Sequence, residues 1–132
     1  MAEKPLVAIV DDDESHRRAT RSLLRSAGFT TATFSDAESF LSSTNRAGAA
    51  CLVADMRMPG MSGLELYEAL VASGEAIPTV LITAYPEDIT RVRARAAGIS
   101  CLLGKPFAPD ELLECIRQAL ARARQGNPIP RS

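Results

Sequence analysis

Five runs of apolar, β-branched or aromatic residues alternate with amphipathic stretches along the chain. Most of these runs lack a regular exchange of apolar and polar positions, so they predict strands that are covered on both faces of a sheet. The predicted strands are Leu6–Val10, Phe29–Phe34, Ala49–Ala54, Pro78–Ile82 and Ser100–Leu103. The predicted helices are Glu14–Ala27, a short stretch from a capping box at Ser35–Glu38 toward Ser43, the residues behind a second capping box at Ser62–Glu65, Glu87–Ala97, and a last helix from Pro109 to Arg124.

The regular order of strand and helix predicts an α/β fold. Right-handed crossovers between successive strands give a parallel sheet with helices on both faces, which is a doubly wound arrangement. A closed eight-stranded barrel needs roughly 250 residues, and the chain has 132. We therefore expect one open-sheet domain over residues 5–124, followed by a flexible tail or linker stub at residues 125–132.

Composition and charge narrow the class of protein. Apolar residues make up 46% of the chain and charged residues 23%, which is typical of a globular domain. No apolar run approaches the roughly 20 residues that span a bilayer, and the first apolar run leads directly into acids, unlike a signal peptide. We expect a cytoplasmic protein without membrane attachment. The net charge of −1 gives no electrostatic reason for direct nucleic-acid binding by this chain.

The three cysteines, Cys51, Cys101 and Cys115, form no CxxC pair. Each lies in an apolar stretch. We therefore expect small buried apolar side chains in a reducing compartment, and neither a zinc site nor redox chemistry.

Polar side chains follow four of the predicted strands, at the points where the strands end. Asp11 and Asp12 follow the first strand, Asp55 the third, Thr83 the fourth and Lys105 the fifth. Open α/β sheets bind ligands at the carboxyl ends of their strands. Carboxylates that converge there repel one another unless a cation neutralises them, and an all-oxygen site favours Mg2+. Lys105 is informative because the chain has 13 arginines but only two lysines.

A hydroxyl and an ammonium beside a metal-bound carboxylate form a site suited to phosphoryl transfer. In such a site a carboxylate attacks phosphorus and forms an acyl phosphate. Each residue alone has a simpler structural role. Asp13 is expected either to cap the following helix or to be a solvated neighbour, and a contact with the metal through a water molecule stays open. A single aspartate after a strand is commonly a turn residue, and a single lysine is commonly exposed. The conjunction of five polar groups in complementary roles favours the functional interpretation.

Four motifs carry a family resemblance, namely Ile9–Asp13, Val53–Gly60, Leu81–Ala84 and Lys105–Phe107. In order and spacing they resemble the receiver domain of bacterial two-component response regulators, over roughly residues 5–124. Within that family, Arg57-Met58-Pro59 and Ser62-Gly63 resemble the FixJ, NarL and LuxR-type branch. The resemblance implies a flavodoxin-like (CheY-like) sheet of five parallel strands in the order 2-1-3-4-5, with five helices.

The resemblance also implies that Asp55 accepts a phosphoryl group from a sensor histidine kinase. It implies that Asp12, Asp55 and the backbone carbonyl of Arg57 bind Mg2+ directly, and that Asp11 binds it directly or through a water molecule. The chain would then be a signalling switch whose own reactions are self-phosphorylation and slow autodephosphorylation, not an enzyme with turnover. Its conformational change would control an output domain, expected to be transcriptional, or a separate partner.

Further roles are implied at the neighbouring strand ends. Lys105 and the backbone amide of Ala84 would bind the phosphoryl oxygens, and Thr83 would move toward them. The Lys105-Pro106 bond is often cis in this family. The switch position three residues before Lys105 is Leu102, where the family usually has an aromatic residue. Coupling to the face formed by the fourth helix, fifth strand and fifth helix is therefore expected to differ.

Several residues keep two interpretations. Arg57 and Tyr85 either set the rate at which water attacks the acyl phosphate or are ordinary loop residues. The arginines within Arg91–Arg95 form either a solvated helix face or part of a homodimer surface on the face of the fourth helix, fifth strand and fifth helix. His16 is expected on the surface, and a contact between it and the kinase stays open.

Four alternative functions are considered. A phosphatase with an aspartyl-phosphate intermediate would need a second acid two residues after Asp55, where Arg57 stands. A nucleotide or flavin binder would need a phosphate loop after the first strand, where acids stand. A serine or cysteine hydrolase is disfavoured because His16 is the single histidine. A receiver that no longer uses phosphate is suggested only by Leu102.

Overall fold

The structure is a computed structural model that describes residues 5–44, 48–84 and 88–124. Within these residues the elements are β1 (Leu6–Val10), α1 (Glu14–Ser26), β2 (Thr30–Phe34), α2 (Ala37–Leu41), β3 (Cys51–Asp55), α3 (Gly63–Ala72), β4 (Thr79–Thr83), α4 (Asp88–Ala97), β5 (Cys101–Gly104) and α5 (Pro109–Arg124). Each predicted strand and helix is present, with ends shifted mostly by one or two residues. The predicted tail at residues 125–132, and Tyr85, lie outside the described residues.

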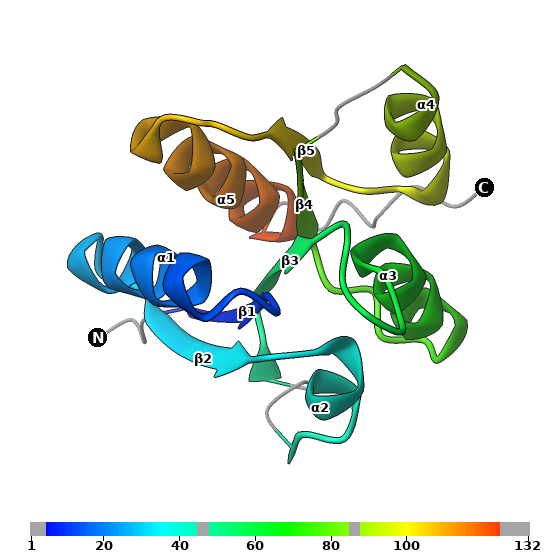
Figure 1. Cartoon of the computed structure of the whole chain (residues 1–132), viewed down its shortest axis with the longest axis horizontal. Coiled ribbons are helices and arrows are strands. Elements are labelled where there is room, and N and C mark those ends of the chain that lie inside the picture. Colours follow the sequence, from blue (N-terminus) through cyan, green and yellow to red (C-terminus); the bar gives the residue numbers. More distant parts are fainter. Residues whose placement is uncertain (1–4, 45–47, 85–87, 125–132) are drawn as a thin grey trace.

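The strands formed by the described residues build one parallel sheet in the order β2-β1-β3-β4-β5. This order confirms the expected doubly wound, flavodoxin-like arrangement. After β2 the chain crosses back over the sheet, and β3 pairs with β1 on the side opposite to β2. The strands β1 and β3 therefore lie side by side, although α1, β2 and α2 separate them in sequence (Figure 1). The carboxyl ends of β1 and β3 therefore meet at the point where ligands bind in sheets of this kind.

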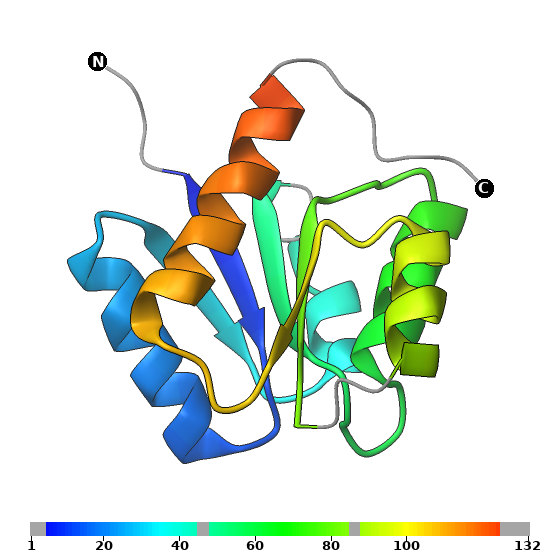
Figure 2. The ribbon, with the colours of Figure 1, turned by 90° about the horizontal axis from the view of Figure 1, so that it is seen from above.

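Successive side chains of each strand pack on opposite faces of the sheet. Val7 and Ile9 of β1 belong to a buried cluster with Leu24 of α1 and Ile116 of α5. The intervening β1 residues pack into a second cluster with side chains of α2, α3 and α4, which includes Phe40, Leu66, Leu70 and Ala94. Figures 1 and 2 show the same division, with α1 and α5 on one side of the sheet and the other three helices opposite. Burial of each large aliphatic side chain contributes about 1.5–3 kcal/mol, so both layers hold the strand ends in place.

Side chains at the helix starts fix where the connecting loops end. Ser62 and Glu65 form the predicted capping box of α3, with the Ser62 backbone N–H donating to Glu65 at 2.9 Å and the Glu65 N–H donating to Ser62 Oγ at 3.1 Å. The predicted box at Ser35–Glu38 was wrong, because the N-cap of α2 is Asp36, which accepts from the Ser39 N–H at 2.7 Å. That N–H holds the pKa of Asp36 below its ordinary value.

The cysteines differ from the prediction in one respect. Cys101 at the start of β5 and Cys115 on α5 are joined by a disulfide, so the prediction of small apolar side chains alone was wrong for this pair. Cys51 is a free, fully buried thiol, as predicted. Burial raises the pKa of Cys51 to about 12.

A helix that crosses a membrane must be long and apolar. In the described ranges, none of the helices combines the length and the apolar character that a bilayer crossing requires.

Candidate functional site

The predicted polar residues all lie at the carboxyl edge of the sheet. Asp55 is the last residue of β3 and Thr83 the last of β4, while Asp11 and Asp12 directly follow β1 and Lys105 directly follows β5. Parallel strands bring these ends to the same edge. Carboxylate oxygens of Asp11, Asp12 and Asp55 all lie within 4.8 Å of one another. The structure therefore brings together the three acids that the sequence analysis grouped.

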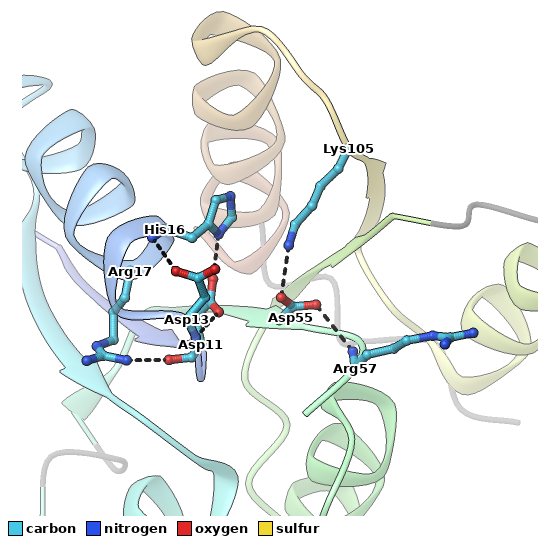
Figure 3. Close-up of polar contacts among 7 residues, drawn as sticks. All are labelled: Asp11, Asp13, His16, Arg17, Asp55, Arg57 and Lys105. Carbon is cyan, nitrogen blue, oxygen red and sulfur yellow. Dashed lines mark hydrogen bonds and ion pairs between the residues drawn. The ribbon is translucent and has the colours of Figure 1, made fainter. Parts of the chain in front are cut away.

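Asp55 is held through both of its carboxylate oxygens. Lys105 Nζ lies 3.0 Å from Asp55 Oδ2, and the Arg57 backbone N–H donates to Asp55 Oδ1 at 3.2 Å (Figure 3). Asp55 is only 8% exposed, whereas the carboxylate of Asp12 is exposed. The Asp55 side chain is thus fixed in direction, with its oxygens at the rim of the sheet and a cation on one side.

Asp11 is anchored more tightly than the sequence analysis foresaw. Its Oδ1 accepts from the Asp13 N–H at 2.9 Å, its Oδ2 lies 2.5 Å from His16 Nδ1, and Arg17 donates to its backbone carbonyl at 2.7 Å. Figure 3 shows His16 and Arg17 reaching back from α1 toward the end of β1. The predicted surface position of His16 is only partly correct, because its side chain is 29% exposed and contacts the acidic cluster.

The start of α1 explains this geometry. Asp13 caps the helix, as predicted, by accepting from the His16 N–H at 3.0 Å, and that N–H holds the pKa of Asp13 below its ordinary value. The cap places the first turn of α1 directly over the end of β1. The capping pattern accounts for the backbone N–H of His16 but not for the contact of its side chain with Asp11, so sequence reasoning missed that contact. The side chain of His16 also meets Phe107 edge-on, at a ring-centroid distance of 6.2 Å.

Gly63 lets α3 begin directly against β3. A Cβ atom at this position would lie 2.5 Å from the Asp55 carbonyl oxygen and 2.9 Å from a methyl carbon of Leu81. The Gly63 N–H donates to the Met56 carbonyl at 3.1 Å. The backbone of Asp55 is therefore in direct contact with the first residue of α3.

Thr83 and Leu102 share one face of the sheet. Leu81 pairs in register with Leu102 and Thr83 with Gly104, and Leu81 belongs to the cluster on the α3 and α4 side. Because side chains two residues apart along a strand point the same way, Thr83 and Leu102 both point toward that side. Thr83 is buried, and its carbonyl accepts from the Lys105 N–H at 2.8 Å. Leu102 is partly buried, and Ala84 is exposed. The Lys105-Pro106 peptide bond is cis, as the resemblance implied.

The acidic cluster has the donor set of a site for a hard divalent cation. All three side chains offer oxygen, and two of them already face a cation or an imidazole. Among the described residues the Asp12 carboxylate has no hydrogen-bond or ion-pair partner. Three like charges at this spacing favour a bound divalent cation, and oxygen-only ligands favour Mg2+ or Ca2+ over softer metals. The residues present therefore fit the metal that the sequence analysis expected.

An apolar groove opens beside this cluster. It has a volume of about 530 Å3 and runs between α1 and the β5–α5 connection. Its lining includes His16, Thr20, Leu23, Lys105, Phe107 and Leu112. The groove thus reaches the same lysine that pairs with Asp55.

Comparisons with known proteins agree with this geometry. The family model described as the response regulator receiver domain matches residues 7–117. Response regulator protein TodT of Pseudomonas putida F1 is 41% identical over 120 residues, which are 91% of this chain and 53% of TodT. Transcriptional regulatory protein FixJ of Bradyrhizobium diazoefficiens is 34% identical over 132 residues, which are 100% of this chain and 63% of FixJ.

Solved structures of response regulators also match this chain. The response regulator StyR matches with a TM-score of 0.84 and 49% identity, over 94% of this chain and 64% of StyR. The structure named FixJ-N matches with a TM-score of 0.81 and 33% identity, over 91% of this chain and 96% of that structure. The chain thus spans about half the length of TodT and nearly the whole of FixJ-N.

Proposed function

Since the chain belongs to the response regulator receiver domains, we propose that it is a phosphorylation switch in which Asp55 accepts the phosphoryl group. The observation that carries this proposal is the position of Asp55 within 4.8 Å of two further acids and 3.0 Å from Lys105. An anionic nucleophile held beside a cation is suited to attack on phosphorus, because the cation offsets charge on the phosphoryl oxygens.

The proposed reaction is a transfer from a phosphohistidine of a sensor histidine kinase. One Asp55 carboxylate oxygen forms a bond to phosphorus, the bond between phosphorus and the imidazole nitrogen breaks, and that nitrogen keeps the electron pair. Lys105 and the backbone amide of Ala84 would bind the phosphoryl oxygens. The contact of Asp55 with the Arg57 N–H keeps the carboxylate aimed in one direction before the reaction.

Asp11, Asp12, Asp55 and the backbone carbonyl of Arg57 would hold Mg2+. When bound, the ion neutralises like charge in the cluster and stabilises negative charge that develops on the phosphoryl oxygens. Asp12 is suited to this role because its carboxylate is exposed and, within the described residues, unpartnered.

Thr83 and Leu102 would carry the signal away from Asp55. They point toward the same side of the sheet and lie on adjacent strands, so movement of Thr83 toward a phosphoryl group would leave space on that side for Leu102. Leucine has no hydroxyl, so the signal would be a change in packing and not a new hydrogen bond. Arg91, Val92 and Arg93 of α4 are exposed, with Val92 67% exposed, which suits the proposed homodimer face of α4, β5 and α5.

Membership in the receiver family implies a sensor kinase as the partner. The apolar groove is suited to a kinase helix because Lys105, which contacts the proposed phosphoacceptor, is one of the residues that line it. TodT and FixJ are named as a response regulator and a transcriptional regulator, and the chain covers only part of each. Control of a transcriptional output domain is therefore proposed for the longer protein in which such a domain occurs.

A phosphodonor of low molecular weight tests the role of Asp55. We expect the protein, incubated with acetyl phosphate and Mg2+, to gain the mass of one phosphoryl group that hydroxylamine removes and that maps to Asp55. The Asp55→Asn variant should gain none. Asp110→Asn, which removes an exposed acid in the first turn of α5, should behave like the wild type. Equal labelling of Asp55→Asn, or no labelling of the wild type, contradicts the proposal.

A further inference from the structure

Cys101 and Cys115 form a chemical site that lies apart from the acidic cluster. Their Cα atoms are 6.0 Å apart, within the range that disulfides require, and their sulfur atoms are bonded. Cys101 is the first residue of β5 and Cys115 lies on α5. The bond thus links a strand to the helix that covers it, across 14 residues of sequence.

The disulfide lies within the proposed signalling face, which is formed by α4, β5 and α5. Cys101 packs into the cluster shared with α1 and α5, whereas its neighbour Leu102 packs on the opposite side of the same strand. A covalent tie at Cys101 therefore restrains the strand that carries the switch position. Because α5 bears the other half of the tie, the disulfide fixes two of the three elements of the face formed by α4, β5 and α5.

Apolar packing also joins β5 and α5, in addition to this bond. Leu103 of β5 and Leu112, Ile116 and Ala119 of α5 are buried in the same cluster. Burial on this scale is expected to hold β5 against α5 in the dithiol form as well, because each large aliphatic side chain contributes about 1.5–3 kcal/mol. Both the dithiol and the disulfide form are therefore compatible with a folded chain.

The two cysteines also differ from the third in exposure. Cys101 is partly exposed and Cys115 is 9% exposed, whereas Cys51 is fully buried with its pKa raised to about 12. A thiol reacts as its thiolate. Exchange with a small disulfide is therefore expected at Cys101 and Cys115 and not at Cys51.

We propose that Cys101 and Cys115 are a two-electron redox site, whose reversible disulfide ties α5 to β5 and limits the conformational response of the chain to phosphorylation. In reducing compartments, disulfides of this kind are transient and serve catalysis or redox sensing. The effect on the response rests on the proposed function of Asp55, whereas the redox site itself does not.

The reaction partner is a disulfide of low molecular weight, such as oxidised glutathione. One cysteine, as thiolate, attacks a sulfur of the small disulfide, forms a mixed disulfide and releases one small thiol. The second cysteine then attacks the protein sulfur of the mixed disulfide and releases the second small thiol. The protein loses two electrons and two protons, which the two released thiols carry. An excess of small thiol reverses both steps.

Counting thiols tests the redox site. The native protein is equilibrated with mixtures of reduced and oxidised glutathione, quenched with acid, unfolded and alkylated with a maleimide. Of the three cysteines, all three should be alkylated in the reduced form and only one, Cys51, in the oxidised form. Proteolysis after Glu111 and Glu114 separates Cys101 from Cys115, so a linked peptide pair identifies the bond.

The controls decide between this pair and other thiol chemistry. Cys51→Ala should leave the linked peptides unchanged, and Cys101→Ala should stop at a glutathione adduct on Cys115 or at no adduct. The proposal is overturned if all three cysteines are alkylated at every ratio of reduced to oxidised glutathione. It is also overturned if the disulfide involves Cys51 or a second copy of the chain.

The response itself is measured with beryllofluoride and Mg2+, which mimic the phosphoryl group. Hydrogen exchange of peptides from β5 and α5 should change on activation in the reduced protein, and this change should be lost in the oxidised protein. A Cys101→Ala/Cys115→Ala variant should respond under both conditions, and the single Cys101→Ala variant serves if the double variant does not fold. Equal responses of oxidised and reduced wild type overturn the regulatory effect.

Labelling of the reduced wild type with acetyl phosphate separates the two proposals. If reduced protein is not labelled on Asp55, the proposed function fails, while the thiol count still decides whether the redox site exists.

Discussion

Lys105 carries the positive charge that Asp55 meets. Its Nζ lies 3.0 Å from Asp55 Oδ2 in a pair whose side chains are 29% and 10% exposed. Such a pair is partly shielded from water, so its charge acts more strongly on a reacting phosphoryl group than an exposed lysine would. In the proposed function Lys105 is suited to stabilise the transition state, and before the reaction it competes with a metal ion for Asp55.

Replacement of this lysine gives the first prediction. In Lys105→Met we expect the rate of labelling by acetyl phosphate to fall on the order of 100-fold, as happens when one group that stabilises developing charge is removed. Mg2+ affinity, measured by calorimetry, should not weaken, because a competing cation has been removed. Arg18→Met, which breaks the exposed pair with Glu14, is the control. A labelling rate equal to that of the control would contradict the role of Lys105.

At the residue scale, the sequence predicted the acids, Thr83 and Lys105 because each is the residue at which an apolar run stops. His16 was not predicted as a neighbour of Asp11. That contact depends on the angle at which α1 packs across the end of β1. The apolar periodicity of α1 predicts which face of the helix is buried, but it does not predict this angle. The same reason applies to Arg17, whose side chain reaches the Asp11 carbonyl.

At the scale of the elements, β3 and α3 meet in direct backbone contact beside the site. Gly63, the first residue of α3, lies where a Cβ atom would meet the Asp55 carbonyl oxygen at 2.5 Å. Backbone atoms cannot move aside as the end of a flexible side chain can. A larger residue at this position must therefore displace either the helix or the strand end that carries Asp55.

The second prediction follows from this contact. Gly63→Ala should lower the free energy of unfolding by about 1–3 kcal/mol, the usual cost of forcing a methyl group into a packed site. It should also slow labelling of Asp55, because the strand end shifts. Gly48→Ala is the matched control, since a Cβ atom there meets nothing within 4 Å. Chemical denaturation measures the first effect. Equal stability of the two variants would show that α3 moves without cost.

At the element scale, strand and helix positions were predictable because apolar runs and cap residues mark them. The N-cap of α2 was assigned to Ser35 and not Asp36, since two adjacent residues are both able to cap and only backbone geometry selects one. The link between Cys101 and Cys115 was missed for a similar reason. Pairing of cysteines from a strand and a helix depends on their distance in space, and their spacing in sequence does not reveal it.

Across the whole molecule, negative charge gathers at one edge of the sheet. Asp11, Asp12 and Asp55 lie within 4.8 Å of one another, whereas the net charge of the chain is only −1. The folded state brings these acids together and the unfolded state separates them. Their mutual repulsion therefore lowers the free energy of unfolding, and a cation that binds only the folded state raises it.

The third prediction concerns this balance. Mg2+ should raise the thermal midpoint of unfolding, with about 2.7 kcal/mol of added stability at a concentration 100 times the dissociation constant. Asp12→Asn should be more stable than the wild type without Mg2+, because it removes one like charge, and should gain much less from Mg2+. Scans at matched ionic strength with NaCl separate binding from screening. An identical Mg2+ shift in Asp12→Asn and the wild type would place the ion elsewhere.

At the scale of the whole molecule, alternation of strands and helices predicted a doubly wound sheet but not its strand order. Order depends on which strands pair, and β1 pairs with β3 although α1, β2 and α2 lie between them in sequence. The order 2-1-3-4-5 came instead from the motifs that resemble receiver domains, and the structure confirms it.

Lys105 and Asp55 are 50 residues apart in sequence, yet they touch. During synthesis the acids emerge first and the lysine follows, so an incomplete chain has the nucleophile without its cation. Strand β5 must pair with β4 before Lys105 reaches Asp55, because β5 has no other neighbour among the described strands. In the proposed function, efficient phosphorylation of Asp55 therefore requires a complete sheet. A chain in which β5 is unpaired would therefore be labelled as slowly as Lys105→Met is expected to be, although its three acids are all present.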